Sequence, residues 1–201
     1  MRRQSHIAMG RFLLRTYLPH LPRQYARLFL LGCIEPDGNP ATYLKGSIRA
    51  QWFQGHNFSN ASPFLFRLTQ RLERKTAFSA WDFYSLGKVI HYTLDAFTYP
   101  HNHHFGKGLS HHRIYEVKLQ LYFLSRLHSF RPDSVDVPDS AADYLRKMHE
   151  TYLLEPGCVE TDTKYALRVS CALIRKLTEN VPRCQLQIVP FSEMDGVLIA
   201  P

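Results

Sequence analysis

Apolar residues recur three and four positions apart along most of the chain, a spacing that predicts amphipathic helices. Prolines, glycines and polar residues divide this pattern into separate segments. The predicted helices cover residues 6–18, 24–33, 63–74, 80–97, 111–129, 140–154 and 160–179. The pattern therefore predicts an all-α fold, a bundle of six or seven helices that forms one domain over residues 1–182. Residues 183–201 lack the helical period and are predicted to form a C-terminal tail.

Serines stand immediately before several of the predicted helices. A serine hydroxyl can accept a hydrogen bond from a free backbone N–H of the first helical turn, so these residues are interpreted as N-caps. They are Ser5, Ser62, Ser79 and Ser110. Between residues 38 and 60 the helical pattern is lost, and a loop of this length indicates a functional role. Just before it, Gly32 and Pro36 are expected to end a helix and to present Glu35 and Asp37 at its exit.

Residues 86–116 hold six of the chain's eleven histidines. His91 is followed four residues later by Asp95, and His112 is followed four residues later by Glu116. Residues four apart lie on one face of a helix, so each pair can offer two ligands to the same metal ion. Two such pairs joined by a histidine-rich turn predict a site for more than one ion.

His91 has a second interpretation, as a core histidine with a satisfied hydrogen bond, and for this residue alone that reading carries more weight. Asp95 counts against it, because two polar groups on one apolar helix face are costly to bury unless something pairs with them. Gly87 lies one turn before His91 and leaves room either for an ion or for a closely packed helix.

Other candidate ligands lie outside the two pairs. His101 follows Pro100, where the helix is expected to end, and can turn back toward the pocket of Asp95. His6 and His56 are weaker candidates in the first sixty residues, together with Asp37. The remaining histidines of the segment have no carboxylate at helical spacing and are interpreted as bystanders: His103, His104 and His111.

The net charge of +8 favours anionic partners, namely phosphate-bearing substrates, nucleic acid or an acidic membrane surface. A merely basic surface explains this charge equally well. The hydrophobic content of 45% and the aromatic content of 13% argue against disorder.

The four cysteines form no Cys-x-x-Cys pair, so a metal ion would be held by histidine and carboxylate side chains, a set that suits zinc. They are interpreted as buried thiols in a reducing compartment, with one or two disulfides as the alternative. The N-terminus shows no signal-peptide pattern, and no apolar run is long enough to span a bilayer. We therefore expect a cytoplasmic protein, or a secreted one if a leader has been removed.

The order of these residues resembles the zinc-dependent phospholipase C family. Its bacterial members are trinuclear zinc enzymes, distantly similar in fold to the S1/P1 nucleases. The segment HYTLDAFTYPH, residues 91–101, is similar to the family's His-x-x-x-Asp-x-x-x-x-x-His segment. The run FLLGCIEPD, residues 29–37, looks like its Gly-x-x-x-Pro-Asp segment, and His112-x-x-x-Glu116 looks like its closing pair. The resemblance extends over about residues 5–120.

The resemblance implies two or three zinc ions and assigns ligands to each. One ion would be held by His56, His91 and Asp95. Asp95 would bridge to a second ion, which His6 also binds. The third ion would be held by His101, His112 and Glu116. Asp37 would be the general base, or would orient the attacking water.

The implied function is zinc-dependent hydrolysis of a phosphodiester by metal-activated water, on phospholipid or a related substrate, with peripheral membrane contact. Two alternatives remain. The first is a nuclease or nucleotidase of the related fold, which typically closes its third site with His-x-x-x-Asp, whereas this chain has Glu116; nucleic acid is therefore the less favoured partner. The second is a metal-binding domain without turnover. It remains because the secreted enzymes bind zinc through an N-terminal tryptophan, whereas this chain begins MRRQSH.

Overall fold

The computed structural model describes residues 1–38, 58–102, 105, 109–132, 137, 140–182 and 186. Over these residues the fold is all-α, as predicted, with seven α-helices, one 3-10 helix and no strand. The elements are α1 (Arg3–Tyr17), α2 (Arg23–Gly38), α3 (Phe58–Glu73), α4 (Ala80–Ala96), η2 (Tyr99–His101), α5 (Leu109–Ser129), α6 (Ala141–Leu153) and α7 (Val159–Thr178). None of these helices is long and apolar enough to cross a membrane.

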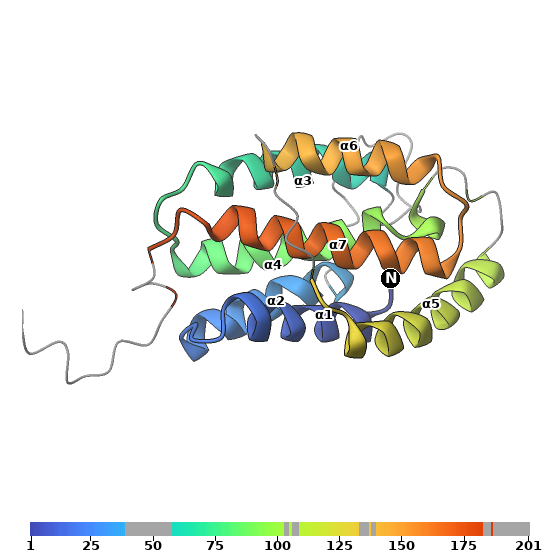
Figure 1. The fold of residues 1–201 in the computed structure, drawn as a ribbon, viewed down its shortest axis with the longest axis horizontal. Helices are drawn as coiled ribbons and strands as arrows, with labels where there is room; N and C mark the ends of the chain where they lie inside the picture. The colour runs from blue at the N-terminus through green and yellow to red at the C-terminus, as the bar shows by residue number, and fades with distance from the viewer. Residues whose placement is uncertain are drawn as a thin grey trace, which may run out of the picture.

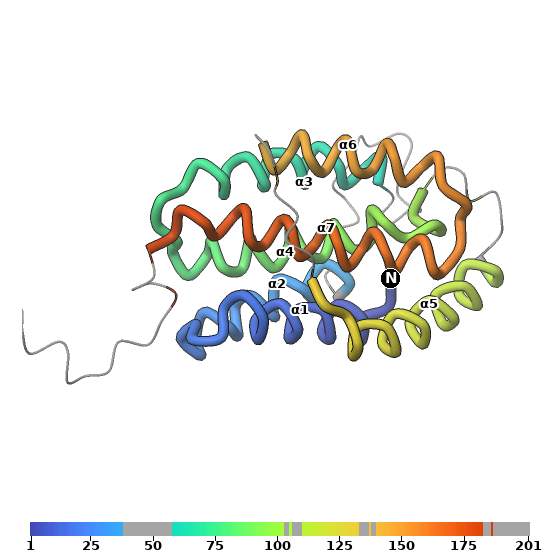
Figure 2. Tube along the Cα trace, viewed as in Figure 1, coloured from blue at the N-terminus to red at the C-terminus, as the bar shows by residue number. Residues whose placement is uncertain are grey.

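The two helices α4 and α7 run side by side through the middle of the bundle (Figure 1). Helices α3 and α6 cover one side of this pair, and α1, α2 and α5 cover the other. The tube in Figure 2 shows that the N-terminus lies among the helices instead of at the rim of the molecule. Met1 is accordingly only 3% exposed. The first residue of the chain therefore belongs to the interior of the bundle, whereas Arg2 is exposed.

The core is built from large apolar side chains that several helices contribute. Phe29 of α2, Phe83 of α4 and Phe123 of α5 have no exposed surface, and neither has Phe97, which follows α4. Helix α4 is buried over almost its whole length, which agrees with its central place. The polar residues that α4 carries are therefore held far from bulk solvent.

Helices α2 and α4 cross in close contact through two glycines. A Cβ atom at Gly87 would lie 2.9 Å from the Cα of Gly32 and would overlap the backbone carbonyl of Phe29. Of the two roles predicted for Gly87, the structure shows the close helix packing. This crossing brings the C-terminal turn of α2 next to the part of α4 that carries His91.

Some predicted helix boundaries are confirmed and others are wrong. Ser79 forms a capping box with Asp82, as predicted. The helix predicted from residue 140 begins at Ala141, and Ser140 precedes it and accepts a hydrogen bond from the backbone N–H of Asp143. Ser5 is instead buried inside α1, which begins at Arg3. The other two predicted caps also fall inside helices, because α3 and α5 begin at Phe58 and Leu109. These early starts place them before Ser62 and Ser110.

The largest correction concerns the end of α2. Pro36 was expected to end this helix, yet α2 continues to Gly38 with Pro36 inside it. A proline so near a helix end removes a single backbone hydrogen bond, and packing against α4 can offset that loss. Asp37 therefore lies on the last helical turn instead of in a loop. Residues 39–57 of the predicted loop, including His56, lie outside the described residues.

The predicted tail at 183–201 also lies outside the described residues, apart from Leu186. The Leu186 side chain packs against the hydrophobic core.

Candidate metal centre

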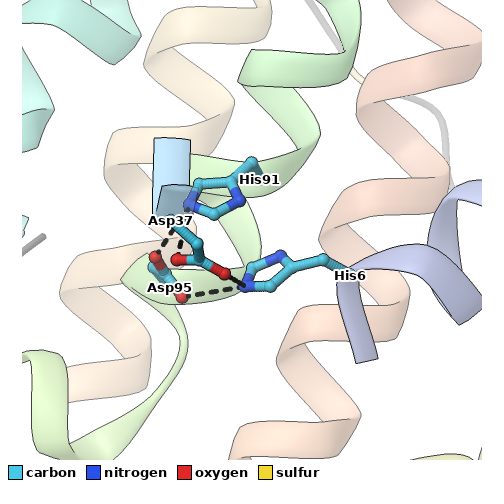
Figure 3. Close-up of side chains that lie close together, drawn as sticks. All are labelled: His6, Asp37, His91 and Asp95. Atoms are coloured by element: carbon cyan, nitrogen blue, oxygen red, sulfur yellow. Dashed lines mark ion pairs between the residues drawn. The ribbon is translucent and has the colours of Figure 1, made fainter. Parts of the chain in front are cut away.

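Helix α4 supplies the centre of the site. His91 has no exposed surface and Asp95 is 1% exposed, and the two lie one turn apart on the same face of α4. His6 reaches them from α1, and Asp37 reaches them from the last turn of α2. Figure 3 shows these four side chains pointing toward one another from three helices. The close crossing of α2 and α4 is what brings Asp37 within reach.

The distances within this first group match the spacing of ligands around one ion. His91 Nε2 lies 3.3 Å from Asp95 Oδ2 and 3.6 Å from Asp37 Oδ1. His6 Nε2 lies 3.4 Å from Asp95 Oδ1 and 4.0 Å from Asp37 Oδ2. Ligands at about 2.1 Å from a tetrahedral zinc ion are about 3.4 Å from one another. The four side chains therefore fit a zinc site.

The orientation of His91 is fixed by the backbone of α2. Its Nδ1 lies 2.9 Å from the carbonyl oxygen of Cys33. A carbonyl can only accept a hydrogen bond, so Nδ1 carries the proton, and in the neutral imidazole the Nε2 lone pair faces the carboxylates. Acceptor atoms that face one another at these distances repel unless a proton or a cation lies between them. The chain thus holds His91 in the tautomer that a metal ligand requires.

A second group lies where η2 meets α5. His101 Nε2 is 3.4 Å from Glu116 Oε1, and His112 Nε2 is 3.5 Å from the same oxygen. His112 and Glu116 form the predicted pair four residues apart, and both are partly exposed. The ligand atoms of this group lie within 4.8 Å of one another, as do those of the first group.

Asp95 connects the two groups. Its Oδ2 lies 3.8 Å from His101 Nδ1, while both of its oxygens face the histidines of the first group. Asp95 Oδ2 and His101 Nδ1 are buried, and neither makes a hydrogen bond with a residue that the structure describes. Buried polar atoms are normally satisfied, so this gap also fits a cation. The position suits a carboxylate shared between two ions.

The backbone of Met1 enters the same space. Its amino group lies 2.6 Å from Asp95 Oδ1, 3.3 Å from Glu116 Oε1 and 3.2 Å from His101 Nε2. Its carbonyl oxygen lies 3.1 Å from His6 Nε2. In a chain that begins at Met1, these two backbone groups lie where the resemblance implies those of an N-terminal tryptophan.

The electrostatics of the cluster favour an ionised Asp95 and a neutral His6. Burial opposes ionisation of Asp95, but the Met1 ammonium group and the nearby histidines outweigh it and hold the pKa of Asp95 well below its usual range. Burial, with a smaller contribution from His91, lowers the pKa of His6 to about 3. An ionised carboxylate and a neutral imidazole are the forms that bind metal.

Asp37 differs from the other carboxylates of the cluster. Burial and the neighbouring Asp95 carboxylate raise the pKa of Asp37. Its side chain is 27% exposed, against 2% for that of Asp95. Burial also opposes ionisation of Glu116, but hydrogen bonds with His101 and His112 lower its pKa. Asp37 is therefore the carboxylate at the edge of the cluster that is best placed to exchange a proton.

The structure brings together every predicted site residue that it describes. These are His6, Asp37, His91, Asp95, His101, His112 and Glu116. His56 lies outside the described residues, as do the expected bystanders His103 and His104. His111 is exposed, as expected for a bystander. The ligand and catalytic roles themselves stay predictions.

The sequence did not predict a set of hydrogen bonds that fixes the turn carrying His101. His149 of α6 is buried, and its Nε2 lies 2.9 Å from the side-chain oxygen of Asn102. The amide of Asn102 donates to the backbone carbonyls of Ala96 and Thr98, at the end of α4. These bonds fix the turn that presents His101. No spacing in the sequence connects residue 149 with residue 102, so the contact could not be foreseen.

Comparison with known proteins gives one match. The comparisons with curated proteins and with solved structures found no match. The family model described as zinc dependent phospholipase C matches residues 5–169, which include every described residue of both groups. Because this match covers most of the 201 residues, the chain belongs to the zinc-dependent phospholipase C family.

Proposed function

We propose that this protein is a zinc-dependent phosphodiester hydrolase that acts on phospholipid in the manner of phospholipase C. The observation that carries the proposal is the pair of ligand groups joined by Asp95 in a chain of this family. The first group would hold zinc through His6, His91 and Asp95, with His56 as a further predicted ligand. The second would hold it through His101, His112 and Glu116. Two or three ions are proposed.

Zinc bound at these residues supplies a Lewis acid for the phosphodiester oxygens and lowers the pKa of water. The chain's own residues then divide the remaining work. Cys33 and Asp95 hold His91 in one tautomer. Asp37, at the exposed edge of the cluster, accepts the proton of the attacking water on its carboxylate. No covalent intermediate with the protein is needed, because water itself is the nucleophile.

We also propose that the outer face of α5 contacts an anionic phospholipid surface. Ile114, Val117 and Leu121 lie on this face and are 57%, 42% and 64% exposed. Arg113 and Lys118 are exposed beside them. The acidic residue of α5, Glu116, points inward to the ligand group, so the exposed face is basic and apolar. Such a face suits insertion at the boundary of an anionic bilayer.

Binding to vesicles tests this contact. The double variant I114S/L121S is expected to lose co-sedimentation with phosphatidylcholine–phosphatidylserine vesicles, because apolar area leaves the contact. L154S removes an 87% exposed leucine at the end of α6 and is expected to bind like the wild type. Equal binding by all three proteins would contradict the proposal. A wild-type dimer that becomes monomeric in I114S/L121S would also contradict it. In that case a second copy of the chain, and not a membrane, would cover the outer face of α5.

Metal analysis combined with assays of hydrolysis tests the function. We expect two or three zinc ions per chain in protein purified without chelator, together with release of phosphorylated headgroup from phosphatidylcholine micelles. D95N is expected to lose both zinc and activity while keeping its helical circular dichroism. D143N changes an exposed aspartate of α6 and is the matched control, expected to keep both.

Three results would count against the proposal. Zinc without hydrolysis of phospholipid, nucleotide or a chromogenic diester would indicate a metal-binding domain instead. Hydrolysis of single-stranded nucleic acid in preference to phospholipid would favour the nuclease alternative. Unchanged zinc stoichiometry in D95N would contradict the assignment of the site.

A further inference from the structure

Asp162 is a buried carboxylate outside both ligand groups. It lies in the first turns of α7 and has no exposed surface. Its Oδ2 accepts hydrogen bonds from the backbone N–H of Tyr99, at 2.8 Å, and from the hydroxyl of Tyr115, at 2.9 Å. Its Oδ1 accepts a hydrogen bond from the hydroxyl of Tyr152, at 2.7 Å. Three donors from three other segments thus converge on one side chain.

Two of these donors belong to the segments that carry the second ligand group. Tyr99 opens η2 and lies two residues before His101. Tyr115 lies on α5 immediately before Glu116. A single oxygen of Asp162 therefore joins η2 to α5 through residues that lie two positions before His101 and one position before Glu116 in the sequence. Tyr152 lies at the end of α6, which supplies neither group.

A purely stabilising role explains this arrangement less well. An acidic side chain near a helix N-terminus interacts favourably with the helix dipole. Such a side chain is normally exposed, so it stabilises the helix without losing its own hydration. Asp162 is buried, and burial of a carboxylate costs free energy that apolar residues of similar size avoid. Its hydrogen bonds to Tyr99, Tyr115 and Tyr152 lead to other elements. What the carboxylate adds is a fixed geometry between them.

We propose that Asp162 is a positioning residue, which sets the spacing of His101 relative to Glu116 and thereby the metal affinity of the second ligand group. The inference rests on the metal-binding part of the proposed function and does not depend on the substrate. Outer hydrogen bonds of this kind typically change metal affinity about 10- to 100-fold. The bond from Tyr115 should therefore affect metal binding directly, whereas the bond from Tyr152 anchors α6 and reaches the second group only through the contact of His149 with Asn102.

The variants Y115F and Y152F provide a matched test, because each removes one hydroxyl that donates to Asp162. Affinity is measured by competition with a chromophoric chelator, and geometry by the visible absorption spectrum of cobalt bound in place of zinc. We expect Y115F to weaken binding of one ion about tenfold or more and to alter the cobalt spectrum. Y152F is expected to lower thermal stability and to change affinity and spectrum less than Y115F does, because Tyr152 lies on α6, which contributes no ligand.

D162A removes both connections, because alanine has no acceptor, and is expected to show the metal defect of Y115F. Should D162A fail to fold, the pair of tyrosine variants still decides the question. Equal metal affinity in Y115F and Y152F, whether reduced or unchanged, would overturn the positioning role while leaving the proposed function intact. A wild-type chain that binds no zinc or cobalt would overturn both proposals.

Discussion

At the scale of single residues, the two carboxylates of the first ligand group are predicted to act differently. Asp95 is enclosed by His6, His91 and His101, whereas Asp37 reaches the cluster from its exposed edge. We expect D37N to reduce kcat about 100-fold or more, since removing a general base typically costs that much. Zinc content should remain, because three ligands still surround the site. Single-turnover kinetics measure the rate, and elemental analysis measures the zinc content. Loss of zinc in D37N would indicate that Asp37 is a metal ligand instead of a general base.

A second residue-scale prediction concerns pH and stability. Burial raises the pKa of Asp162 to about 6, above the ordinary aspartate value of 3.8. Between these values the folded state keeps a proton that the unfolded state has released, so stability falls as pH rises. A shift of this size corresponds to about 3 kcal/mol. The unfolding free energy of the wild type relative to D162N should therefore decrease from pH 4 to pH 7.

Urea denaturation of the two proteins at matched zinc concentration measures this difference, because other titrating groups contribute to both. A difference that is flat, or that increases with pH, would contradict the assigned pKa of Asp162.

At the scale of elements, the crossing of α2 and α4 determines whether Asp37 reaches His91. G87A places a methyl group against the backbone of α2, which has no side chain to move aside. Overpacking usually costs about 1–3 kcal/mol, and we expect G87A to reach at least the upper part of this range. G10A is the matched control: its methyl group would meet the ends of the Leu30 and Cys33 side chains. Thermal denaturation should show a larger loss in G87A, and equal losses would argue against backbone contact.

At the scale of the whole molecule, the ligand groups join four helices, since α1, α2, α4 and α5 each contribute a side chain. Metal bound only by the folded state should therefore stabilise the entire bundle. At a free zinc concentration 100 times the dissociation constant, one site contributes about 2.7 kcal/mol. We expect chelator to lower the Tm of the wild type and added zinc to restore it. D95N should show no such response; an equal response in D95N would place the stabilising metal elsewhere.

Local patterns in the sequence determined where helices form and which His–carboxylate pairs share a helix face. Ser79 identifies a helix start because a cap depends on neighbouring residues alone. The pairs His91–Asp95 and His112–Glu116 were visible because a helix places residues four apart on one face. The family resemblance then supplied the distant members, since local spacing alone cannot join His6 to Asp95.

The tertiary structure decided how these pieces meet. It extended α2 through Pro36, because packing against α4 outweighs one lost hydrogen bond, and so put Asp37 on a rigid turn. It showed that Gly87 packs against α2 and does not leave room for an ion. The backbones of α2 and α4 can approach this closely because Gly32 lies opposite Gly87. It also placed Asp162 of α7 behind the segments that carry His101 and Glu116. Such contacts join residues far apart in the chain and leave no periodic trace, so only the packed bundle could reveal them.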